Sequence, residues 1–183
     1  MKKHLILLAV CAGLGACQST PHANNMVLPA MATPQDAANV EQWYQAEWFW
    51  RQHSIAFLMM LRPDSDGSKV LLATTLTGQE LFALKEQQGQ FTVLEQRPET
   101  KRIPLAYVYR DVAWVHASTA AFNAMTADQN TFVATHHSKY WAQNGKTMWQ
   151  AQLQDGGAWL VNNPSASYQM RLTPIDNSTE VAP

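Results

Sequence analysis

Short apolar runs alternate with turn sequences between residues 55 and 96, and no other feature constrains the fold as strongly. The sequence PDSDG at residues 63–67 separates the first two runs, and the segments 74–80 and 86–89 separate the next ones. Proline, aspartate, serine and glycine are the residues that hairpin turns use. We therefore predict four antiparallel strands joined in chain order, which is a meander.

The first strand of this meander is apolar on both faces. Its two faces carry Ile55, Phe57, Met59 and Leu61 on one side and Ala56, Leu58 and Met60 on the other. A strand of this kind is covered on both sides.

The C-terminal third of the chain returns to strand patterns. Asn144-Gly145 is the strongest short signal for a hairpin turn. After this turn, apolar residues alternate with glutamines over residues 149–154, and apolar and polar residues alternate again over 168–173. This alternation is typical of a strand with one buried and one solvated face. Together with the meander, it predicts seven or eight strands in a mainly β fold with some helix.

The segment between these two sets of strands is alanine-rich and lacks clean alternation. We predict short helices at residues 104–111 and 118–127. The β-branched and aromatic residues of "AYVYRDVAWV" leave a strand open as an alternative for the first segment, because such residues are poor helix formers in isolation.

A further helix is predicted before the first strand. Thr33 suits the N-cap, Pro34 suits the first helical position, and Asp36 completes a pattern that is similar to a capping box. This helix is expected to run to about Ala46, with Val40, Trp43 and Tyr44 on one side.

The first residues resemble a bacterial lipoprotein signal. Lys2 and Lys3 precede an apolar run of about ten residues, which suits a signal peptide and is too short to span a bilayer. Leu14-Gly15-Ala16-Cys17 then resembles a lipobox, and the resemblance implies that Cys17 carries the lipid anchor. Because Gln18 rather than aspartate follows it, the resemblance also implies the periplasmic face of the outer membrane. The alternative is an ordinary secretory signal with an incidental cysteine.

The predicted organisation is a signal peptide at residues 1–16, a flexible tether at 17–33, a β domain at 34–175 and a disordered tail at 176–183. Removal of the signal removes Lys2 and Lys3, which leaves 11 basic and 14 acidic residues and a net charge near −3. No basic patch favours nucleic-acid binding. Cys17 is then the only cysteine, so no disulfide is expected.

Motifs for catalysis or metal binding are missing from the sequence. It contains no G-x-S-x-G, Walker loop or H-E-x-x-H. His136 and His137 are predicted on opposite faces of a strand, one at the surface and one in the core, where they cannot form one chelate. Asp64 and Asp66 lack the spacing of a calcium loop and are interpreted as turn residues. We therefore expect no enzyme, no cofactor and no metal site.

Two features bear on function. Leu76 occupies the tip of a predicted hairpin, two residues before the turn glycine Gly78, although a turn should be polar. The chain is also rich in tryptophan, methionine and phenylalanine, while only 15% of its residues are charged. That composition fits either a well-filled core or an apolar cavity of the kind that binds lipid.

The order of these features resembles the LolA/LolB-type fold of lipoprotein carriers. The closest local match is "LLATTLTGQELFALKEQQGQFTVLEQ" at residues 71–96, where Leu76 precedes a glycine as in the LolB loop. The resemblance implies an incomplete antiparallel β-barrel, with short helices that cover or plug it, around an apolar cavity for acyl chains. It also implies that Leu76 inserts into the membrane. A partly buried leucine at a strand end is the alternative.

The chain also resembles a family of outer-membrane lipoproteins that are often encoded beside aryl-polyene or fatty-acid-like biosynthesis genes. "RDVAWVHASTAAFNAM" is similar to the middle motif of that family and "NNPSASYQMRLTPI" to its ending. Trp114-Val115-His116 departs from the Trp-Pro that is often seen in the middle motif.

Two functions remain open at this point. The first is a lipoprotein that binds acyl chains or a lipid-linked molecule and assists its insertion into the outer membrane, with membrane lipid, a lipoprotein or lipid-linked cargo, and a periplasmic carrier or inner-membrane exporter as partners. The second is a non-catalytic accessory lipoprotein that docks an export or assembly machine. For the first function, the expected apolar lining consists of Phe57, Met59, Leu72, Phe82, Leu84, Trp114, Trp149 and Tyr168.

Overall fold

The computed structural model describes residues 41–125 and 130–175. The predicted signal peptide, the tether with Cys17, and the C-terminal tail lie outside the described residues. The described chain is mainly β, and its elements follow one another as β1 (Gln42–Trp50), β2 (His53–Pro63), β3 (Lys69–Thr74), β4 (Glu80–Gln87), β5 (Gln90–Gln96), the 3₁₀ turn η1 (Pro98–Thr100), α1 (Leu105–His116), α2 (Thr119–Asn123), β6 (Asn130–Ala134), β7 (Ser138–Gln143), β8 (Lys146–Leu153), β9 (Trp159–Asn163) and β10 (Tyr168–Pro174).

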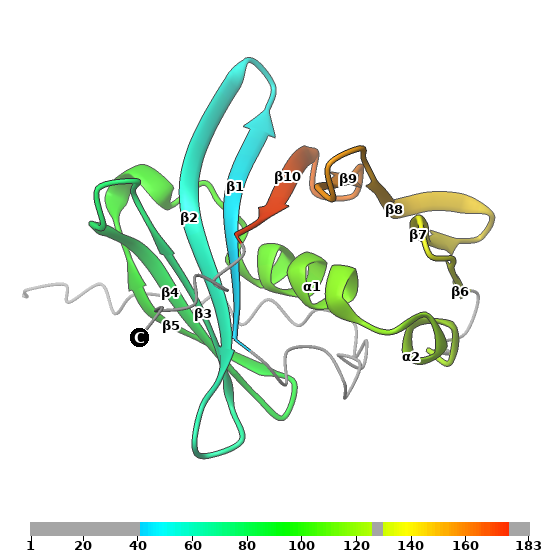
Figure 1. Ribbon diagram of the computed structural model, residues 1–183, viewed down its shortest axis with the longest axis horizontal. Helices are drawn as coiled ribbons and strands as arrows, with labels where there is room; N and C mark the ends of the chain where they lie inside the picture. Colours follow the sequence, from blue (N-terminus) through cyan, green and yellow to red (C-terminus); the bar gives the residue numbers. More distant parts are fainter. Residues whose placement is uncertain (1–40, 126–129, 176–183) are drawn as a thin grey trace, which may run out of the picture.

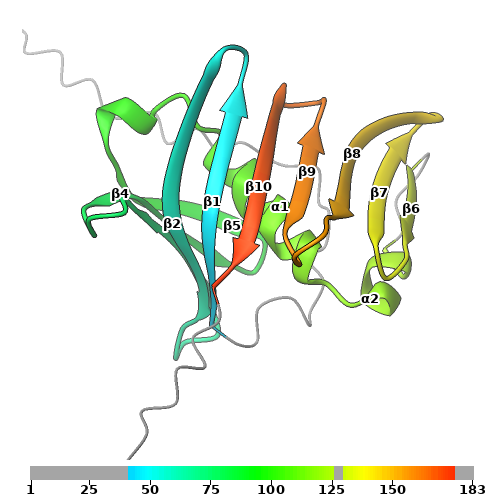
Figure 2. The ribbon, with the colours of Figure 1, turned by 45° about the horizontal axis from the view of Figure 1, so that its top comes forward.

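The strands form one antiparallel sheet of ten strands, in the order β5-β4-β3-β2-β1-β10-β9-β8-β7-β6. Each half of the sheet is built of sequential hairpins, and the pairing of β1 with β10 joins the two halves. β5 and β6 form the two edges, so the sheet is strongly curved but not closed (Figure 2). The predicted meander of four strands is present as β2 to β5.

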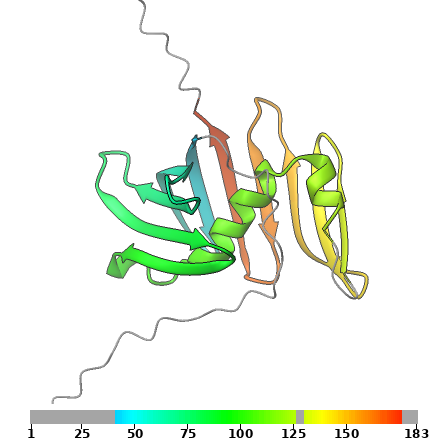
Figure 3. The same ribbon diagram turned by 90° about the horizontal axis from the view of Figure 1, so that it is seen from below.

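α1 lies against the concave face of this sheet, between its two halves (Figure 1). Seen from below, the sheet bends around the helix (Figure 3). Inward-facing residues of β1 to β4 and of β8 to β10 form a single apolar core with α1. On β10 the predicted alternation is observed, since Tyr168, Met170 and Leu172 are buried while Gln169 and Arg171 are exposed.

The prediction of a helix up to Ala46 is wrong for the part that the structure describes, because residues 42–46 belong to β1. Tyr44, Ala46 and Trp48 are buried at every second position, which is the period of a strand. The aromatic residues of this segment favour a strand, and β1 hydrogen-bonds to β2 on one side and β10 on the other. The predicted start of that helix at residues 34–40 lies outside the described residues.

α1 is a helix, so the strand alternative for this segment is wrong, and the helix extends beyond the predicted end to His116. Ten of its twelve residues are buried. A helix that is apolar on all sides is stable only when it is surrounded by other elements. Burial therefore overrides the weak helix propensity of its valines and aromatic residues.

The sheet has ten strands rather than the seven or eight predicted. One extra strand is β1, and the other arises because β6 and β7 are separate strands joined by a turn. His136 and His137 both lie exposed in that turn, so the prediction of one surface and one core histidine on a strand is wrong. The Asn144-Gly145 hairpin is confirmed, with φ of 51° and 76° at its two residues.

No helix within residues 41–125 and 130–175 has the length and apolar character needed to cross a membrane.

Candidate functional site

The apolar surface under α1 contains most of the residues that we predicted to line a cavity. Seven of them belong to the buried core: Phe57, Met59, Phe82, Leu84, Trp114, Trp149 and Tyr168. Trp114 is part of α1 itself, and the other six face it from the sheet. Leu72 lies on the opposite face, because its neighbours Leu71 and Ala73 point into the core and strand side chains alternate.

A buried polar network fixes α1 to the β9–β10 hairpin. The guanidinium of Arg110 donates two hydrogen bonds to Oδ1 of Asp111, at 2.9 and 2.7 Å. Oδ2 of Asp111 accepts hydrogen bonds from Nδ2 of Asn163, at 2.9 Å, and from the hydroxyl of Tyr168. Burial raises the pKa of Asp111, and Arg110 and the hydrogen bonds oppose that rise. Arg110 also lies 4.6 Å over the ring of Trp114. The charges are therefore paired and hydrogen-bonded, as buried charges require.

The C-terminus of α1 is capped by a lysine from the sheet. Lys139 of β7 is buried, and its Nζ donates hydrogen bonds to the carbonyl oxygens of Trp114, Val115 and Ala117. The last carbonyls of a helix have no partner within the helix and carry partial negative charge, so a cation there is favourable.

Two further polar contacts connect α1 to the first half of the sheet. The hydroxyl of Tyr109 donates to Oε2 of Glu86 at 3.2 Å, and burial together with this carboxylate raises the pKa of Tyr109. At the other end of the helix, the hydroxyl of Tyr44 is hydrogen-bonded to Nε2 of His116. Burial, with a smaller contribution from Lys139, lowers the pKa of His116 to about 4.

The lowered pKa of His116 predicts a loss of stability in acid. The unfolded chain binds a proton at this side chain below about pH 6.5, whereas the folded chain does so only below about pH 4. The free energy of unfolding should therefore fall between pH 6.5 and pH 4, by on the order of 1 kcal/mol for each pH unit. Urea unfolding at several pH values measures this. His116→Gln, whose amide can still bond to Tyr44, should remove most of the slope, and an unchanged slope would show that other groups cause it.

Aromatic rings fill the end of the core next to β6, β7 and β8. Trp114 makes edge-to-face contacts with the rings of Phe122, Phe132, Trp141 and Trp149, with centroid distances of 5.0–6.0 Å. The indole N–H groups of Trp114, Trp149 and Trp48 are buried and have no acceptor among the described residues. A buried donor without a partner costs about 1–3 kcal/mol, so an acceptor introduced by a ligand would relieve that cost.

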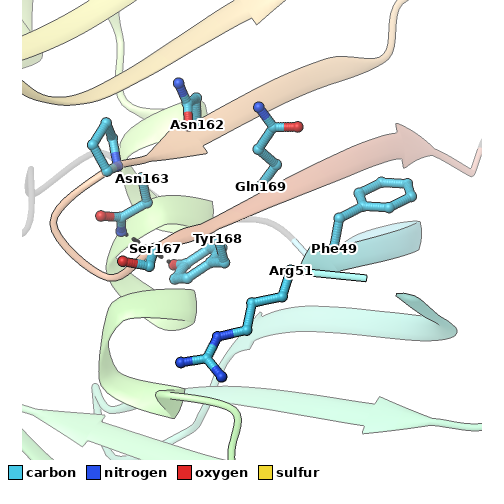
Figure 4. Close-up of a pocket in the computed structure, with 8 residues that line it drawn as sticks. Phe49, Arg51, Asn162, Asn163, Ser167, Tyr168 and Gln169 are labelled. Carbon is cyan, nitrogen blue, oxygen red and sulfur yellow. Dashed lines mark hydrogen bonds between the residues drawn. The ribbon is translucent and has the colours of Figure 1, made fainter. Parts of the chain in front are cut away.

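A pocket of about 210 Å³ opens at the rim of the sheet, where the β1–β2 turn lies near the β9–β10 connection (Figure 4). Arg51 and Phe49 line it from the first hairpin, and Asn162, Tyr168 and Gln169 line it from the second. Of these residues only Tyr168 was predicted to belong to a site, because the two hairpins are more than 100 residues apart in the chain.

The β3–β4 turn presents Leu76 to solvent. Its side chain is 62% exposed, so the alternative of a partly buried leucine does not hold. The turn is ordered by polar contacts on both sides of Leu76: the amide of Gly78 donates to the carbonyl of Thr75, and the amide of Gln79 donates to the hydroxyl of Thr75. These bonds hold the leucine at the tip of the hairpin.

The turn residues between β2 and β3 behave as predicted. Asp66 accepts hydrogen bonds from Ser68 and from Nζ of Lys85, which lies 2.7 Å away, and these bonds lower the pKa of Asp66. Among the described residues, no three histidine, cysteine or acidic side chains lie close enough to hold a metal ion.

The described chain is thus an open, strongly curved antiparallel sheet with a helix on its concave face. It belongs to the family described as "Protein of unknown function (DUF3261)", whose model matches residues 40–176 and so includes every described strand and helix. The comparison with curated proteins gives no match. Among solved structures, the crystal structure of the LolA superfamily protein NE2245 from Nitrosomonas europaea is similar at 8% identity and a TM-score of 0.34, over 79% of this chain and 89% of that chain. A likeness at that score carries no functional argument. The association with aryl-polyene biosynthesis stays a prediction.

Proposed function

We propose that this protein is an outer-membrane lipoprotein that binds acyl chains or a lipid-linked molecule between α1 and the concave face of the sheet, and assists its transfer into the outer membrane. One observation carries the proposal: a continuous apolar concave surface is covered mainly by a single helix of twelve residues. Displacing that helix, which is about 18 Å long at 1.5 Å per residue, would expose the apolar surface beneath it. Each CH₂ group moved from water into such a surface gains roughly 0.8 kcal/mol.

The polar groups in this core also suit such a ligand. Within residues 41–125 and 130–175, the buried indole N–H groups of Trp48, Trp114 and Trp149 have no acceptor, and the ester or carboxyl oxygens of an acylated molecule are acceptors. Binding of this kind needs no metal, cofactor or catalytic group. The predicted anchor at Cys17 would keep the domain beside the membrane that receives the cargo.

Co-purification of lipid tests this function. The chain from Gln18 onward, secreted without the predicted anchor, would be purified without detergent, extracted with organic solvent and examined by mass spectrometry. We expect an acyl-bearing molecule at close to one per chain, and none with an unrelated secreted protein prepared in parallel. A lipid-free protein that also fails to take up added fatty acid would sink the proposal.

The exposed leucine at the hairpin tip gives a second test. Leu76→Glu should leave the free energy of unfolding within about 0.5 kcal/mol, because the side chain is exposed, while it weakens binding to lipid vesicles several-fold. Leu94→Glu is the matched control, since Leu94 is also a leucine and is 53% exposed on β5. Vesicle flotation measures both variants. Equal binding by Leu76→Glu and the unchanged protein would remove the membrane role of the tip.

An accessory role is the second candidate, and the β5 edge favours it. Among the described strands none pairs with the outer side of β5, and most of the β5 side chains, including Val93 and Leu94, are exposed. Unprotected apolar edges pair readily with other chains. Membrane pull-downs with both variants separate the two functions. If Leu94→Glu loses a protein partner that Leu76→Glu retains, docking at β5 becomes the better account.

A further inference from the structure

A row of neutral side chains crosses the convex face of the sheet. Tyr140 of β7 lies opposite Gln150 of β8, which lies opposite Asn162 of β9. Asn162 lies opposite Gln169 of β10, which lies opposite Phe49 of β1. We call these five residues the amide row. They point away from α1, because their neighbours along each strand face the core or the helix and strand side chains alternate.

Figure 4 shows part of the amide row. Asn162, Gln169 and Phe49 project from one side of the sheet, whereas Tyr168 and Arg51 lie on the other side. The row is therefore separate from the apolar surface beneath α1, although both use β1, β8, β9 and β10.

The three amides at the centre of the amide row are accessible and unpaired. Gln169 is exposed, and Gln150 and Asn162 are half-buried. Within residues 41–125 and 130–175, none of these three side chains makes a hydrogen bond. Each amide offers a carbonyl oxygen as acceptor and an NH₂ group with two donors. Because adjacent strands lie about 4.8 Å apart, the amides repeat donors and acceptors at that spacing across the sheet.

An aromatic ring stands at each end of the amide row. Tyr140 is 38% exposed, and Phe49 is half-buried. Four strand intervals separate the two residues, which is a span of about 19 Å. Protein interfaces have an apolar centre and a polar rim. The amide row has the reverse order, with polar groups at its centre and apolar groups at its ends, so a protein partner fits it poorly.

The amide row contains no charged residue. In the next row along β10 and β1, Arg171 and Glu47 are register partners, and their side chains lie 3.6 Å apart. This cation is therefore paired with a carboxylate. Nucleic acids are held chiefly by cations that contact their phosphates. A ligand of the amide row is accordingly expected to be neutral and rich in hydrogen-bonding groups.

We propose that the amide row binds a neutral oligosaccharide. The hydroxyl groups at the edge of a sugar ring donate and accept hydrogen bonds, as amides do, and the C–H groups on its faces pack on aromatic rings. The amides bind the hydroxyls of the central sugars, and Tyr140 and Phe49 contact the terminal ones. A span of about 19 Å suits several linked sugars rather than one. This inference does not rest on the proposed acyl binding, because the row lies on the opposite face of the sheet from α1.

Calorimetric titration of the full chain with hexasaccharides tests the proposal. The protein is kept in a polyoxyethylene detergent, which has no sugar headgroup to compete. Cellohexaose, chitohexaose and maltohexaose are the neutral probes, and hexagalacturonate, with a carboxylate on each ring, is the charged control. We expect at least one neutral probe to bind, and hexagalacturonate to bind about tenfold more weakly or less, because the row has no cation for its carboxylates. The proposal is overturned if no neutral probe binds at millimolar concentration, or if hexagalacturonate binds equally well.

A matched pair of variants assigns the binding to the amide row. Gln169→Ala and Gln90→Ala each remove an exposed amide from a strand, but Gln90 belongs to the edge strand β5. Both should leave Tm within about 3 °C of its original value. Only Gln169→Ala should weaken binding of the neutral probe, by about threefold to tenfold. If Gln169→Ala binds the probe as tightly as Gln90→Ala does, the assignment to the row is overturned.

A second pair of variants tests the aromatic end of the row. Tyr140→Ala should weaken binding by about threefold to tenfold, whereas Tyr140→Phe, which keeps the ring, should retain it. Equal binding by Tyr140→Ala and Tyr140→Phe would remove Tyr140 from the site.

Discussion

Replacing Asp111 with alanine is expected to lower the free energy of unfolding by about 3–5 kcal/mol. The carboxylate is fully buried, and its removal leaves Arg110 as an unpaired buried charge and leaves the donors of Asn163 and Tyr168 without their acceptor. The loss also detaches α1 from the β9–β10 hairpin, because this network is the polar connection between them. Equilibrium unfolding in urea, followed by tryptophan fluorescence, measures the effect.

The control for this prediction is an ion pair at the surface. Glu47 and Arg171 lie 3.6 Å apart with both side chains substantially exposed, so Glu47→Ala should cost less than about 1 kcal/mol. An effect of Asp111→Ala as small as that of Glu47→Ala would show that the buried network does not hold the helix.

Trp114→Ala is expected to lower the free energy of unfolding by a similar amount, about 3–5 kcal/mol. Trp114 is fully buried at the centre of the aromatic cluster, and its removal leaves a cavity that the surrounding rings fill only in part. It also removes the ring over which the guanidinium of Arg110 lies. Thermal unfolding gives the measurement. Trp43→Ala is the matched control, because Trp43 is only partly buried, and its effect should be less than half as large. Equal losses from Trp114→Ala and Trp43→Ala would show that the aromatic cluster around Trp114 does not make a special contribution to the stability of the core.

The hairpins were predictable because their signals are local. PDSDG and Asn144-Gly145 contain the residues that a turn needs within a few positions, and the alternation after Asn144-Gly145 identifies the buried face. β1 was not predictable in the same way. Thr33 and Pro34, which precede it in the chain, resemble a helix start, whereas residues 42–50 form a strand that β2 and β10 hydrogen-bond on both sides.

The apolar part of the candidate site was largely predictable, whereas its polar part was not. Six of the seven predicted residues that are buried lie on predicted strands, and two of them, Trp149 and Tyr168, lie where the alternation is visible in the sequence. Asn163 and Tyr168, which donate to Asp111, lie 52 and 57 residues away from it, and the partners of Lys139 lie 22 to 25 residues away, so only the fold brings these groups together. A signal was present for the first case, because Arg110-Asp111 lies inside an otherwise apolar segment and buried charges require partners.

Photo-cross-linking with a diazirine-bearing fatty acid tests the central claim most directly. The secreted chain from Gln18 onward would be irradiated with the bound probe, digested and mapped by mass spectrometry. We predict adducts on concave-face residues such as Met59, Phe82 and Met170, and none on Leu72, which lies on the convex face of β3. Adducts confined to the convex face or to the β5 edge, or no adducts at saturating probe, would contradict acyl binding beneath α1.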